Sequence, residues 1–373
     1  MVYRPQVDKL KASAYNLGNY KPNLRLERRK LALGVFRMHK TKKQELPVLA
    51  IDLGGTKIIA AIISNKGQVI AKEYRLALAD EGPQAVIKRI LSAIDHLLSL
   101  RNIDSSQLDS ISIAAAGAID FDKGLVTSSP NLPGWYDIPL RDIIKERYAV
   151  NTFLINDANA AALGERHFGA GKRVNNLIFL IVGTGIGGGI IINGKLYQGP
   201  CGSAGEIGHT TIDVNGPRCT CGNVGCLEML ASGTAVAREA IRRISQGEKS
   251  SLTEIVDCKV EDITAEKVSI AAQDGDSLAL EVISKAATYL GVGMVNLVNI
   301  FNPEMIIVGG GMAKMGDLLL GPARRVVRER AFSLSAQAVR IVPAQLGDDA
   351  GVFGAAIFAR QQKHLINSFK LAG

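Results

Sequence analysis

Residues 48–74 of this 373-residue chain read VLAIDLGGTKIIAAIISNKGQVIAKEY, and this stretch decides the predicted fold. Gly54-Gly55 and Asn65-Lys66-Gly67 divide it into two apolar runs and a third, mixed segment, and residues of these types favour tight turns. Segments of this length between turn residues predict three consecutive β-strands. The predicted strands are Val48–Leu53, Ile58–Ile63 and Gln68–Tyr74.

Strands and helices alternate along the rest of the chain. Apolar residues recur at helical spacing over Pro83–Leu100, which predicts an amphipathic helix. Further strands are predicted at Ser110–Ala115, Phe153–Asn156, from Leu177 onwards and at Met305–Val308, and further helices at Asp157–Phe168, from Ser232 onwards and at Asp348–Arg360. Because no long structureless loop interrupts it, this alternation predicts an α/β chain of two lobes.

The net charge of +9 is concentrated in residues 1–45, which hold 12 Lys and Arg against 3 Asp and Glu. The other 328 residues hold 32 of each kind and are neutral, so the charge does not argue for a specific nucleic-acid partner. Leu24, Leu31 and Met38 are seven residues apart, which allows a short amphipathic helix in this basic extension. Translation starting at Met38 would place the first strand about ten residues from the amino terminus.

No membrane segment is expected. The longest apolar run near the amino terminus is Leu31–Phe36, which is too short for a secretory signal. Glycines interrupt Leu177–Asn193 and asparagines interrupt Tyr289–Pro303, so these stretches are predicted to be a buried strand and a buried helix. With 47% hydrophobic and 21% charged residues, we expect a soluble, cytoplasmic protein with no membrane partner.

Three of the five cysteines lie within eight residues. His209, Cys219, Cys221 and Cys226 form the pattern H-x9-C-x-C-x4-C. Four nitrogen and sulfur ligands at this spacing are typical of a closed tetrahedral zinc site, and ordinary buried cysteines are the alternative. Cys201 and Cys258 lie outside the pattern and are expected to be packing residues.

The first glycine-rich turn is Asp52–Lys57. Its two glycines leave backbone amides free for an anion, and the Asp52 carboxylate can hold a metal ion, whereas a simple β-turn is the alternative.

The second glycine-rich stretch, Gly183–Gly189, contains G-x-G-x-x-G after a strand. A dinucleotide site needs a helix next, but Ile190–Ile192 and the turn Asn193-Gly194 predict a hairpin. A Walker A motif is excluded because Leu196 stands where Ser or Thr is required. We predict a glycine loop between strands that phosphates can approach, and a purely structural loop is the alternative.

Three carboxylates are candidates for chemistry. Asp157 follows Asn156 at the junction of a strand and a helix, where it is either a helix cap or a general base at the mouth of a cleft. Glu206 and Glu228 flank the predicted zinc loop, which would fix their positions; a solvated surface role is the alternative.

Taken together, these motifs resemble the ROK family of sugar kinases and sugar-responsive repressors, and most closely its glucokinase branch. The resemblance extends from about Val48 to about Ala359. Gly202–His209 with Cys219–Glu228 is similar to the family's zinc and sugar signature, and Asn302-Pro303-Glu304 leading to Gly309–Gly311 is similar to its adenosine-binding segment.

The resemblance implies a two-lobed actin-like (ribonuclease-H-like) ATPase fold with a zinc-binding loop. The lobes would be a small α/β lobe over residues 46–166, completed by the carboxy-terminal helix 348–373, and a large α/β lobe over residues 167–347 with the zinc loop and the sugar site. Residues 1–45 would be an extension outside this fold.

The resemblance also implies a role for each site residue. Asp157 would be the catalytic base, and zinc would be held by His209, Cys219, Cys221 and Cys226. The sugar would contact Asn131, Asn156, Asp157, Glu206, His209 and Glu228. ATP with Mg²⁺ would contact Asp52, Gly54, Gly55, Thr56, Lys57, Gly183, Thr184, Gly185, Gly187, Gly309, Gly310 and Gly311.

The implied activity is ATP-dependent phosphorylation of a hexose at its 6-hydroxyl, most of all glucose, by a dimer or tetramer. An N-acetylhexosamine kinase is one alternative, and a sugar-responsive regulator is another. Repressors of the family carry a winged helix-turn-helix before this region, and residues 1–45 show no two helices joined by a turn. Binding of DNA through a complete domain is therefore not expected.

Overall fold

The computed structural model describes residues 46–372, which contain two five-stranded sheets. The first sheet has the order β3-β2-β1-β4-β8. In it β2 lies antiparallel to β1 and to β3, whereas β4 is parallel to β1 and to β8. The strands are β1 (Val48–Leu53), β2 (Lys57–Ile63), β3 (Val69–Leu76), β4 (Ser110–Ala115) and β8 (Thr152–Asn156).

The second sheet repeats this arrangement, with the order β11-β10-β9-β12-β13. Here β9 is central and β10 and β11 follow it as antiparallel hairpins, while β12 and β13 are parallel to it. The strands are β9 (Leu177–Val182), β10 (Ile186–Ile192), β11 (Lys195–Tyr197), β12 (Met305–Gly309) and β13 (Arg340–Pro343). In both sheets a glycine-rich turn thus joins the central strand to its antiparallel neighbour.

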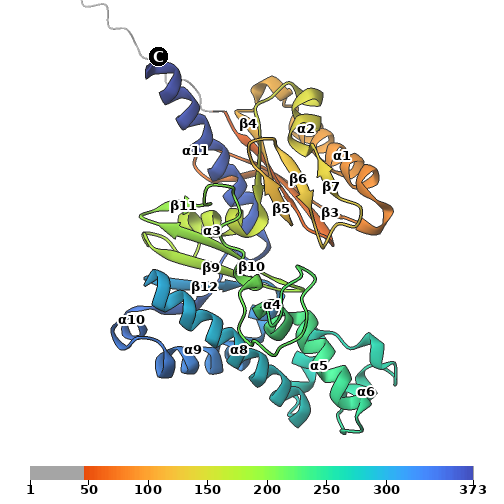
Figure 1. Ribbon diagram of the computed structural model, residues 1–373. Coiled ribbons are helices and arrows are strands. Elements are labelled where there is room, and N and C mark those ends of the chain that lie inside the picture. The colour runs from red at the N-terminus through yellow and green to blue at the C-terminus, as the bar shows by residue number, and fades with distance from the viewer. Residues whose placement is uncertain (1–45, 373) are drawn as a thin grey trace, which may run out of the picture. The chain divides into compact units, whose positions relative to one another are not determined.

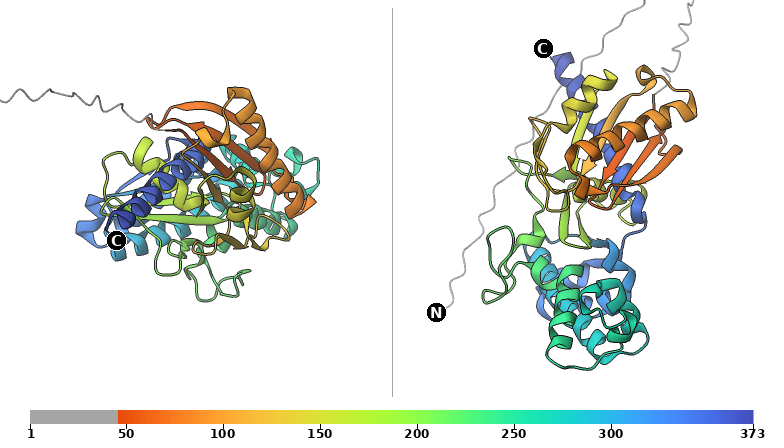
Figure 2. Two further views of the ribbon diagram at one scale, coloured as in Figure 1. Left: turned by 90° about the horizontal axis from the view of Figure 1, so that it is seen from above. Right: turned by 90° about the vertical axis from the view of Figure 1, so that its right-hand side faces the viewer.

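Helices cover both faces of each sheet (Figures 1 and 2). Helices α3 (Asp157–Phe168) and α11 (Ala350–Ala372) lie between the sheets, in one buried cluster with residues of β1, β9 and β12. Helices α1 (Pro83–Arg101) and α2 (Leu140–Tyr148) pack on the outer face of the first sheet. The outer face of the second sheet carries α4 (Leu227–Ala231), α5 (Gly233–Ser245), α7 (Ala265–Gln273), α8 (Ser277–Phe301) and α9 (Asp317–Arg330), with α6 (Leu252–Ile255) and α10 (Ser333–Ala338) beside them.

Helix α8 has the length and the apolar composition of a membrane span, the one such helix among the described residues. Its residues Leu290, Met294 and Val298 are buried in the core that it shares with α5 and α9. The prediction of a buried helix over Tyr289–Pro303 is thereby confirmed, and the helix extends further toward the amino terminus than expected.

The predicted strands and helices are confirmed, with small shifts at their ends. Val48–Leu53, Ser110–Ala115 and Asp157–Phe168 have the predicted bounds. The last helix was placed too early, because residues 347–349 form a separate 3-10 turn before α11 begins at Ala350. The amphipathic helix expected around Leu24–Met38 and the whole extension 1–45 lie outside the described residues.

The prediction of an open glycine loop over Gly183–Gly189 is wrong in its second half. Only residues 183–185 form a turn, and Gly187, Gly188 and Gly189 are part of strand β10. A Cβ atom on Gly189 would lie 2.6 Å from Cβ of Ala162 and 2.7 Å from the carbonyl oxygen of Ala158. These glycines therefore let α3 lie directly on the strand.

A small third sheet was not predicted. It consists of β5 (Ala118–Asp120), β6 (Leu125–Ser128) and β7 (Tyr136–Ile138), and its strands are only three or four residues long. Runs this short carry no clear period in the sequence. The sheet matters because it begins directly after Gly117, next to the site described below.

Candidate active site

Asp157 is the first residue of α3 and lies half-buried where β8 ends. Its Oδ1 accepts hydrogen bonds from the backbone N–H of Ala158 (2.8 Å) and from Nδ2 of Asn156 (3.0 Å). Burial raises the pKa of Asp157 to about 6, with a further increase from the nearby Glu206 carboxylate. Among the described residues no hydrogen bond engages Oδ2, so this oxygen is free to accept a proton.

Asn156, and not Asp157, caps the helix. Its Oδ1 accepts from the backbone N–H of Asn159 (3.1 Å), and its Nδ2 donates to the carbonyl of Gly117 (3.1 Å) as well as to Asp157. Because Asn156 is the N-cap, Asp157 contributes only Oδ1 to the first turn of the helix, through the N–H of Ala158, and its Oδ2 has no such role. A sugar hydroxyl could reach Asn156 only at the second lone pair of Oδ1.

Asp52 lies near the end of β1, at the first glycine turn. Burial raises the pKa of its carboxyl group to about 7, and the negative charge of Asp157 adds to the increase. Lys57 lowers the same pKa, but Lys57 also pairs with Asp348, with 2.5 Å between Nζ and Oδ1. This excess of negative charge around a half-buried carboxylate suits a bound cation such as Mg²⁺.

The first glycine turn has backbone N–H groups that are available to bind an anion. Among the described residues, the N–H groups of Gly55 and Thr56 donate no hydrogen bond. Asn131 lies against this turn, because a Cβ atom on Gly55 would come within 2.4 Å of the Asn131 carbonyl oxygen. Asn131 is therefore placed beside the predicted phosphate turn.

The second turn, Gly183–Gly185, is closed by a hydrogen bond from the N–H of Gly183 to the carbonyl of Gly185 (2.9 Å). In the described part of the chain the amides of Thr184 and Gly185 have no hydrogen-bond acceptor. Both glycine turns thus combine a strand end with two free N–H groups, an arrangement that binds anionic oxygens. Gly187 is placed apart from the turn, on β10.

The third glycine motif lies at the end of β12. Gly309 is buried in the strand, and a Cβ atom on Gly310 would come within 2.5 Å of the carbonyl oxygen of Val182 at the end of β9. Gly311 has open space around it and begins a 3-10 turn. The segment therefore lies next to the second turn, where a nucleotide bound by that turn would extend.

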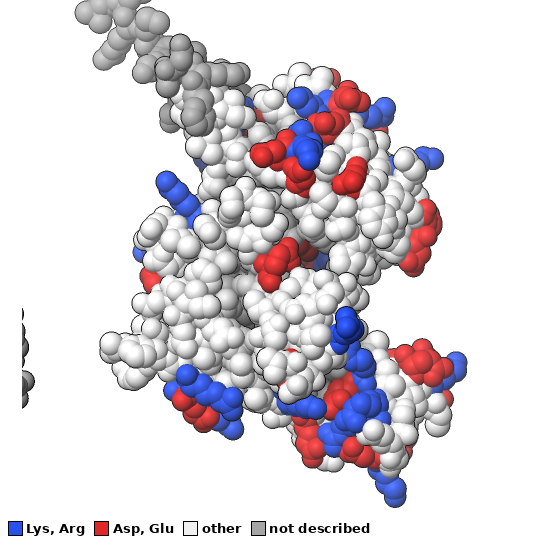
Figure 3. Space-filling view, viewed as in Figure 1, with Lys and Arg blue, Asp and Glu red and all other residues white. Residues whose placement is uncertain are grey.

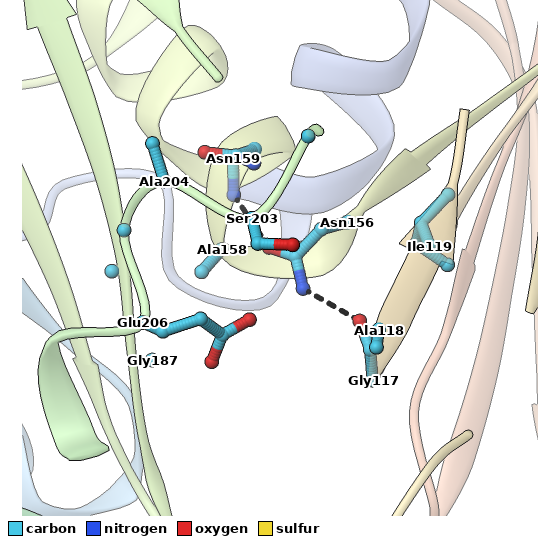
Figure 4. A pocket seen from close by; sticks show the side chains of 13 residues that line it. Gly117, Ala118, Ile119, Asn156, Ala158, Asn159, Gly187, Ser203, Ala204 and Glu206 are labelled. Atoms are coloured by element: carbon cyan, nitrogen blue, oxygen red, sulfur yellow. Dashed lines mark hydrogen bonds between the residues drawn. The ribbon is translucent and has the colours of Figure 1, made fainter. Parts of the chain in front are cut away.

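A pocket separates the start of α3 from the segment that follows β11 (Figure 4). In the close-up view, the Asn156 amide points to Gly117, and the Glu206 carboxylate extends toward the same space. The pocket is lined by Gly117, Ala118, Ile119, Asn156, Ala158, Asn159, Gly187, Gly188, Gly202, Ser203, Ala204, Gly205 and Glu206. Acidic side chains are also visible in the hollow in the middle of the face shown in Figure 3.

Glu206 lines this pocket, and His209 and Glu228 are its electrostatic neighbours. Burial raises the pKa of Glu206, His209 lowers it and Glu228 raises it. Glu228 is half-buried, and its Oε2 accepts a hydrogen bond from the backbone N–H of Ile186 (2.8 Å). The carboxylates of Asp52, Asp157, Glu206 and Glu228 thus form a series of electrostatic neighbours from the first turn to the second.

The four predicted zinc ligands come together. A ring nitrogen of His209 and the three cysteine sulfur atoms all lie within 4.8 Å of one another. Within this cluster, Cys219 Sγ lies 3.6 Å from His209 Nδ1, and Cys221 Sγ lies 3.8 Å from Cys226 Sγ. Backbone bonds from Cys219 N–H to Asn223 (2.8 Å) and from Gly225 N–H to Pro217 (2.9 Å) shape the loop.

These distances fit a tetrahedral zinc ion. With Zn–S bonds of about 2.3 Å and Zn–N bonds of about 2.0–2.1 Å, tetrahedral angles place two sulfurs about 3.8 Å apart and a sulfur and a nitrogen about 3.6 Å apart. Zinc would be held by Nδ1 of His209, which leaves Nε2 of the ring for another partner. The ion would fix the segment from Glu206 to Glu228.

Several residues of the site were not found from the sequence. Asp348 and Asp349 pair with Lys57 and Lys72, and Gly351 lies against Asp52. Two adjacent aspartates before a helix, Asp348 and Asp349, were the one sequence feature that could have pointed to these residues. Their lysine partners lie almost 300 residues away in the chain, so the pairing could not be inferred. The role of Gly117 and the lining residues Gly202–Gly205 likewise depends on contacts that no local pattern specifies.

Comparison with known proteins agrees with this geometry. Residues 48–362 match the ROK family. The chain is 36% identical over 318 residues to a glucokinase of Thermotoga maritima, which covers 85% of this chain and 98% of that protein. It is also 36% identical over 308 residues to a xylose repressor of Caldicellulosiruptor bescii, which covers 82% of this chain and 76% of the repressor.

A solved structure is similar as well. A ROK family glucokinase of Streptomyces griseus, in complex with glucose and AMPPNP, aligns with a TM-score of 0.74 at 34% identity. The alignment covers 84% of this chain and 99% of that chain.

Proposed function

The chain belongs to the ROK family and is a sugar kinase of the hexokinase type, and from this premise we propose that it transfers the γ-phosphoryl group of ATP to the 6-hydroxyl of glucose. Family membership also confirms the predicted two-lobed, actin-like (ribonuclease-H-like) ATPase fold. The observation that carries the proposal is the position of Asp157, which is an electrostatic neighbour of both Asp52 at the first glycine turn and Glu206 on the zinc side.

The nucleotide side of the site supports ATP as the phosphoryl donor. The free amides at Gly55, Thr56, Thr184 and Gly185 suit the phosphate oxygens, and Asp52 would hold Mg²⁺. When bound, Mg²⁺ would neutralise charge on the β- and γ-phosphates. Lys57 would supply a positive charge at the same turn. The three glycines at 309–311 would face the nucleoside end.

The sugar side supports a polyhydroxylated acceptor. Carboxylate and amide groups can hydrogen-bond several hydroxyls at once. Glu206 and Asn156 line one pocket, and His209 is an electrostatic neighbour of Glu206. Structural zinc would keep His209 and the neighbouring carboxylates in place.

Asp157 would act as the general base. Oδ2 of Asp157 takes the proton of the 6-hydroxyl, the sugar oxygen forms a bond to the γ-phosphorus, and the bond from that phosphorus to the β–γ bridging oxygen breaks to leave ADP. The hydrogen bonds from Ala158 and Asn156 hold Oδ1 and so orient Oδ2. A carboxylate whose pKa is about 6 is ionised at neutral pH and is still basic enough to take the proton.

The acceptor is tested by a coupled assay of ADP release with zinc-loaded protein, Mg-ATP and a panel of sugars. We expect the highest kcat/KM for glucose, over mannose, N-acetylglucosamine and N-acetylmannosamine. A higher kcat/KM for an N-acetylhexosamine would make that sugar, and not glucose, the preferred acceptor. ADP release that does not depend on any sugar would contradict the proposed sugar kinase activity.

The similarity to xylose repressors supports a second candidate, a sugar-responsive regulator. Asp157, Asp52 and both glycine turns favour the kinase. A gel-shift titration discriminates between them, because contact through the basic extension alone would be sequence-independent and steeply dependent on salt. The cytoplasmic location, the dimer or tetramer and the division into lobes at residues 166 and 347 stay predictions.

A further inference from the structure

We propose that Glu228 is a positioning residue that holds the second glycine turn and thereby couples the sugar side of the site to the nucleotide side. The inference rests on the proposed function, because it takes Gly183–Gly185 as a phosphate turn. It adds that a carboxylate expected to contact only sugar also sets the affinity for nucleotide.

The contact between Glu228 and the turn is direct. Oε2 of Glu228 accepts the backbone N–H of Ile186, the first residue of β10, at 2.8 Å. A Cβ atom on Gly185 would lie 2.3 Å from this oxygen. The Glu228 carboxylate therefore packs against the end of the turn, at Gly185 and Ile186. A side chain at position 185 would not leave room for this contact.

The other carboxylate oxygen of Glu228 does not contact the turn through a hydrogen bond. Within the described part of the chain, no hydrogen bond engages Oε1 of Glu228. Glu228 is an electrostatic neighbour of Glu206, which lines the pocket. One oxygen thus holds the nucleotide turn, and the other is available to a sugar hydroxyl.

The residues after Glu228 hold the same turn from a second direction. The N–H of Gly233 donates to the carbonyl of Gly183 (2.7 Å), and Oγ1 of Thr234 donates to the carbonyl of Thr184 (2.8 Å). These bonds direct both carbonyls toward the start of α5 and leave the amides of Thr184 and Gly185 free. The supporting segment 228–234 begins two residues after Cys226, a predicted zinc ligand.

The arrangement has a thermodynamic consequence. A sugar hydroxyl bound to Oε1 would fix the Glu228 side chain, and a fixed side chain orders the turn for phosphate. By linkage, sugar should tighten nucleotide binding and nucleotide should tighten sugar binding by the same factor. Loss of the carboxylate should weaken nucleotide binding even when no sugar is present.

The test measures the Kd of zinc-loaded protein for Mg-AMPPNP by calorimetry, with and without glucose. We expect Glu228→Ala to raise the Kd without glucose about tenfold or more, since a hydrogen bond to a charged group is lost. Addition of glucose should tighten binding in the wild type and not in this variant. In steady-state kinetics the KM for ATP should rise along with the KM for glucose.

Three further variants make the test specific. Glu206→Ala removes the neighbouring carboxylate, which has no hydrogen bond to the turn, and should leave the nucleotide Kd measured without glucose within about twofold of wild type. Glu228→Gln keeps an oxygen that can accept from Ile186 and should restore most of the nucleotide affinity. Gly185→Ala should displace Glu228 from the other side and raise the Kd as Glu228→Ala does.

The double variant Gly185→Ala, Glu228→Ala should bind nucleotide no more weakly than either single variant, because both substitutions remove the same contact. Equal zinc content in all variants is required for the comparison. If Glu228→Ala fails to fold, the Gly185→Ala and Glu228→Gln proteins carry the test. If Glu228→Ala or Gly185→Ala binds nucleotide as tightly as wild type, the inference about Glu228 is overturned and the proposed function stands. If the wild-type protein binds no nucleotide, the proposed function is overturned as well.

Discussion

At the scale of single residues, the environment of Asp157 decides between the two roles that the sequence allowed for it, helix cap and general base. Asn156 caps the helix, so Asp157 is available for chemistry. Burial and the Glu206 charge bring the pKa of Asp157 to about 6.

Replacement of Asp157 by Asn should lower kcat by roughly 10²–10⁴, the usual contribution of a general base. The Asn Oδ1 can still accept from Ala158 and Asn156, so glucose affinity by calorimetry and the circular dichroism spectrum should stay close to wild type. Wild-type turnover in Asp157→Asn would remove this residue from the mechanism.

The same raised pKa predicts how activity depends on pH. A base with a pKa of about 6 is protonated below that value, so kcat/KM should fall about tenfold per pH unit below pH 6 and level off above pH 7. The residual activity of Asp157→Asn should vary less steeply over this range, and the variation that remains is expected from Asp52, whose pKa is about 7. A flat wild-type profile between pH 5 and 7 would contradict the assignment.

At the scale of elements, glycines and a metal loop allow segments to approach more closely than side chains would permit. Strand β10 lies directly under α3 because Gly189 has no Cβ. The zinc loop joins the Glu206 segment to α4 through four ligands from two separate parts of the sequence.

Gly189→Ala tests the contact between β10 and α3. The new methyl group would meet Ala162 and the rigid backbone of Ala158, so we expect a loss of about 1–3 kcal/mol in the free energy of unfolding, measured by denaturant titration. Gly321→Ala on α9 is the matched control. Its nearest neighbour would be 3.9 Å away, and it should be neutral or more stable by about 0.5–1 kcal/mol. Equal stability of the two variants would contradict this account.

Removal of zinc tests the loop. The purified protein should contain about one zinc per chain, and Cys221→Ser or a strong chelator should remove it and lower the Tm by on the order of several degrees. Cys258→Ser changes an exposed cysteine outside the cluster and should retain both zinc and Tm. A wild-type protein without zinc would disprove the site.

At the scale of the whole molecule, Glu165 connects distant parts of the fold. This fully buried residue lies near the end of α3, and its Oε1 accepts the backbone N–H groups of Gln345 (2.9 Å) and Leu346 (2.7 Å). Its Oε2 accepts the N–H of Ala170 (2.8 Å). The helix that begins with Asp157 is thereby joined to the segment that carries Asp348.

Glu165→Ala should lower the free energy of unfolding by at least about 2 kcal/mol, because three backbone N–H groups lose their acceptor. The exposed Glu146 on α2 provides a control, and Glu146→Ala should change stability by less than about 0.5 kcal/mol. Denaturant titrations of both variants make the comparison; a neutral Glu165→Ala would show that this connection does not stabilise the fold.

The sequence by itself determined the features that are local along the chain. Periodicity identified α1, turn residues around the first glycine pair identified β1, β2 and β3, and the cysteine spacing identified the cluster that the fold brings together, His209, Cys219, Cys221 and Cys226. Each of these depends on neighbours within a few residues or one loop, so the information is present in a short segment.

Only the tertiary structure decided which distant groups meet. It placed Gly187–Gly189 in a strand, brought Asp348 to Lys57, and put the Glu228 carboxylate on the second turn. The pKa of Asp157 is likewise a product of burial and of Glu206, which is 49 positions further along the chain. Burial and charge interactions depend on distance in space, and a pattern along the chain does not contain that distance.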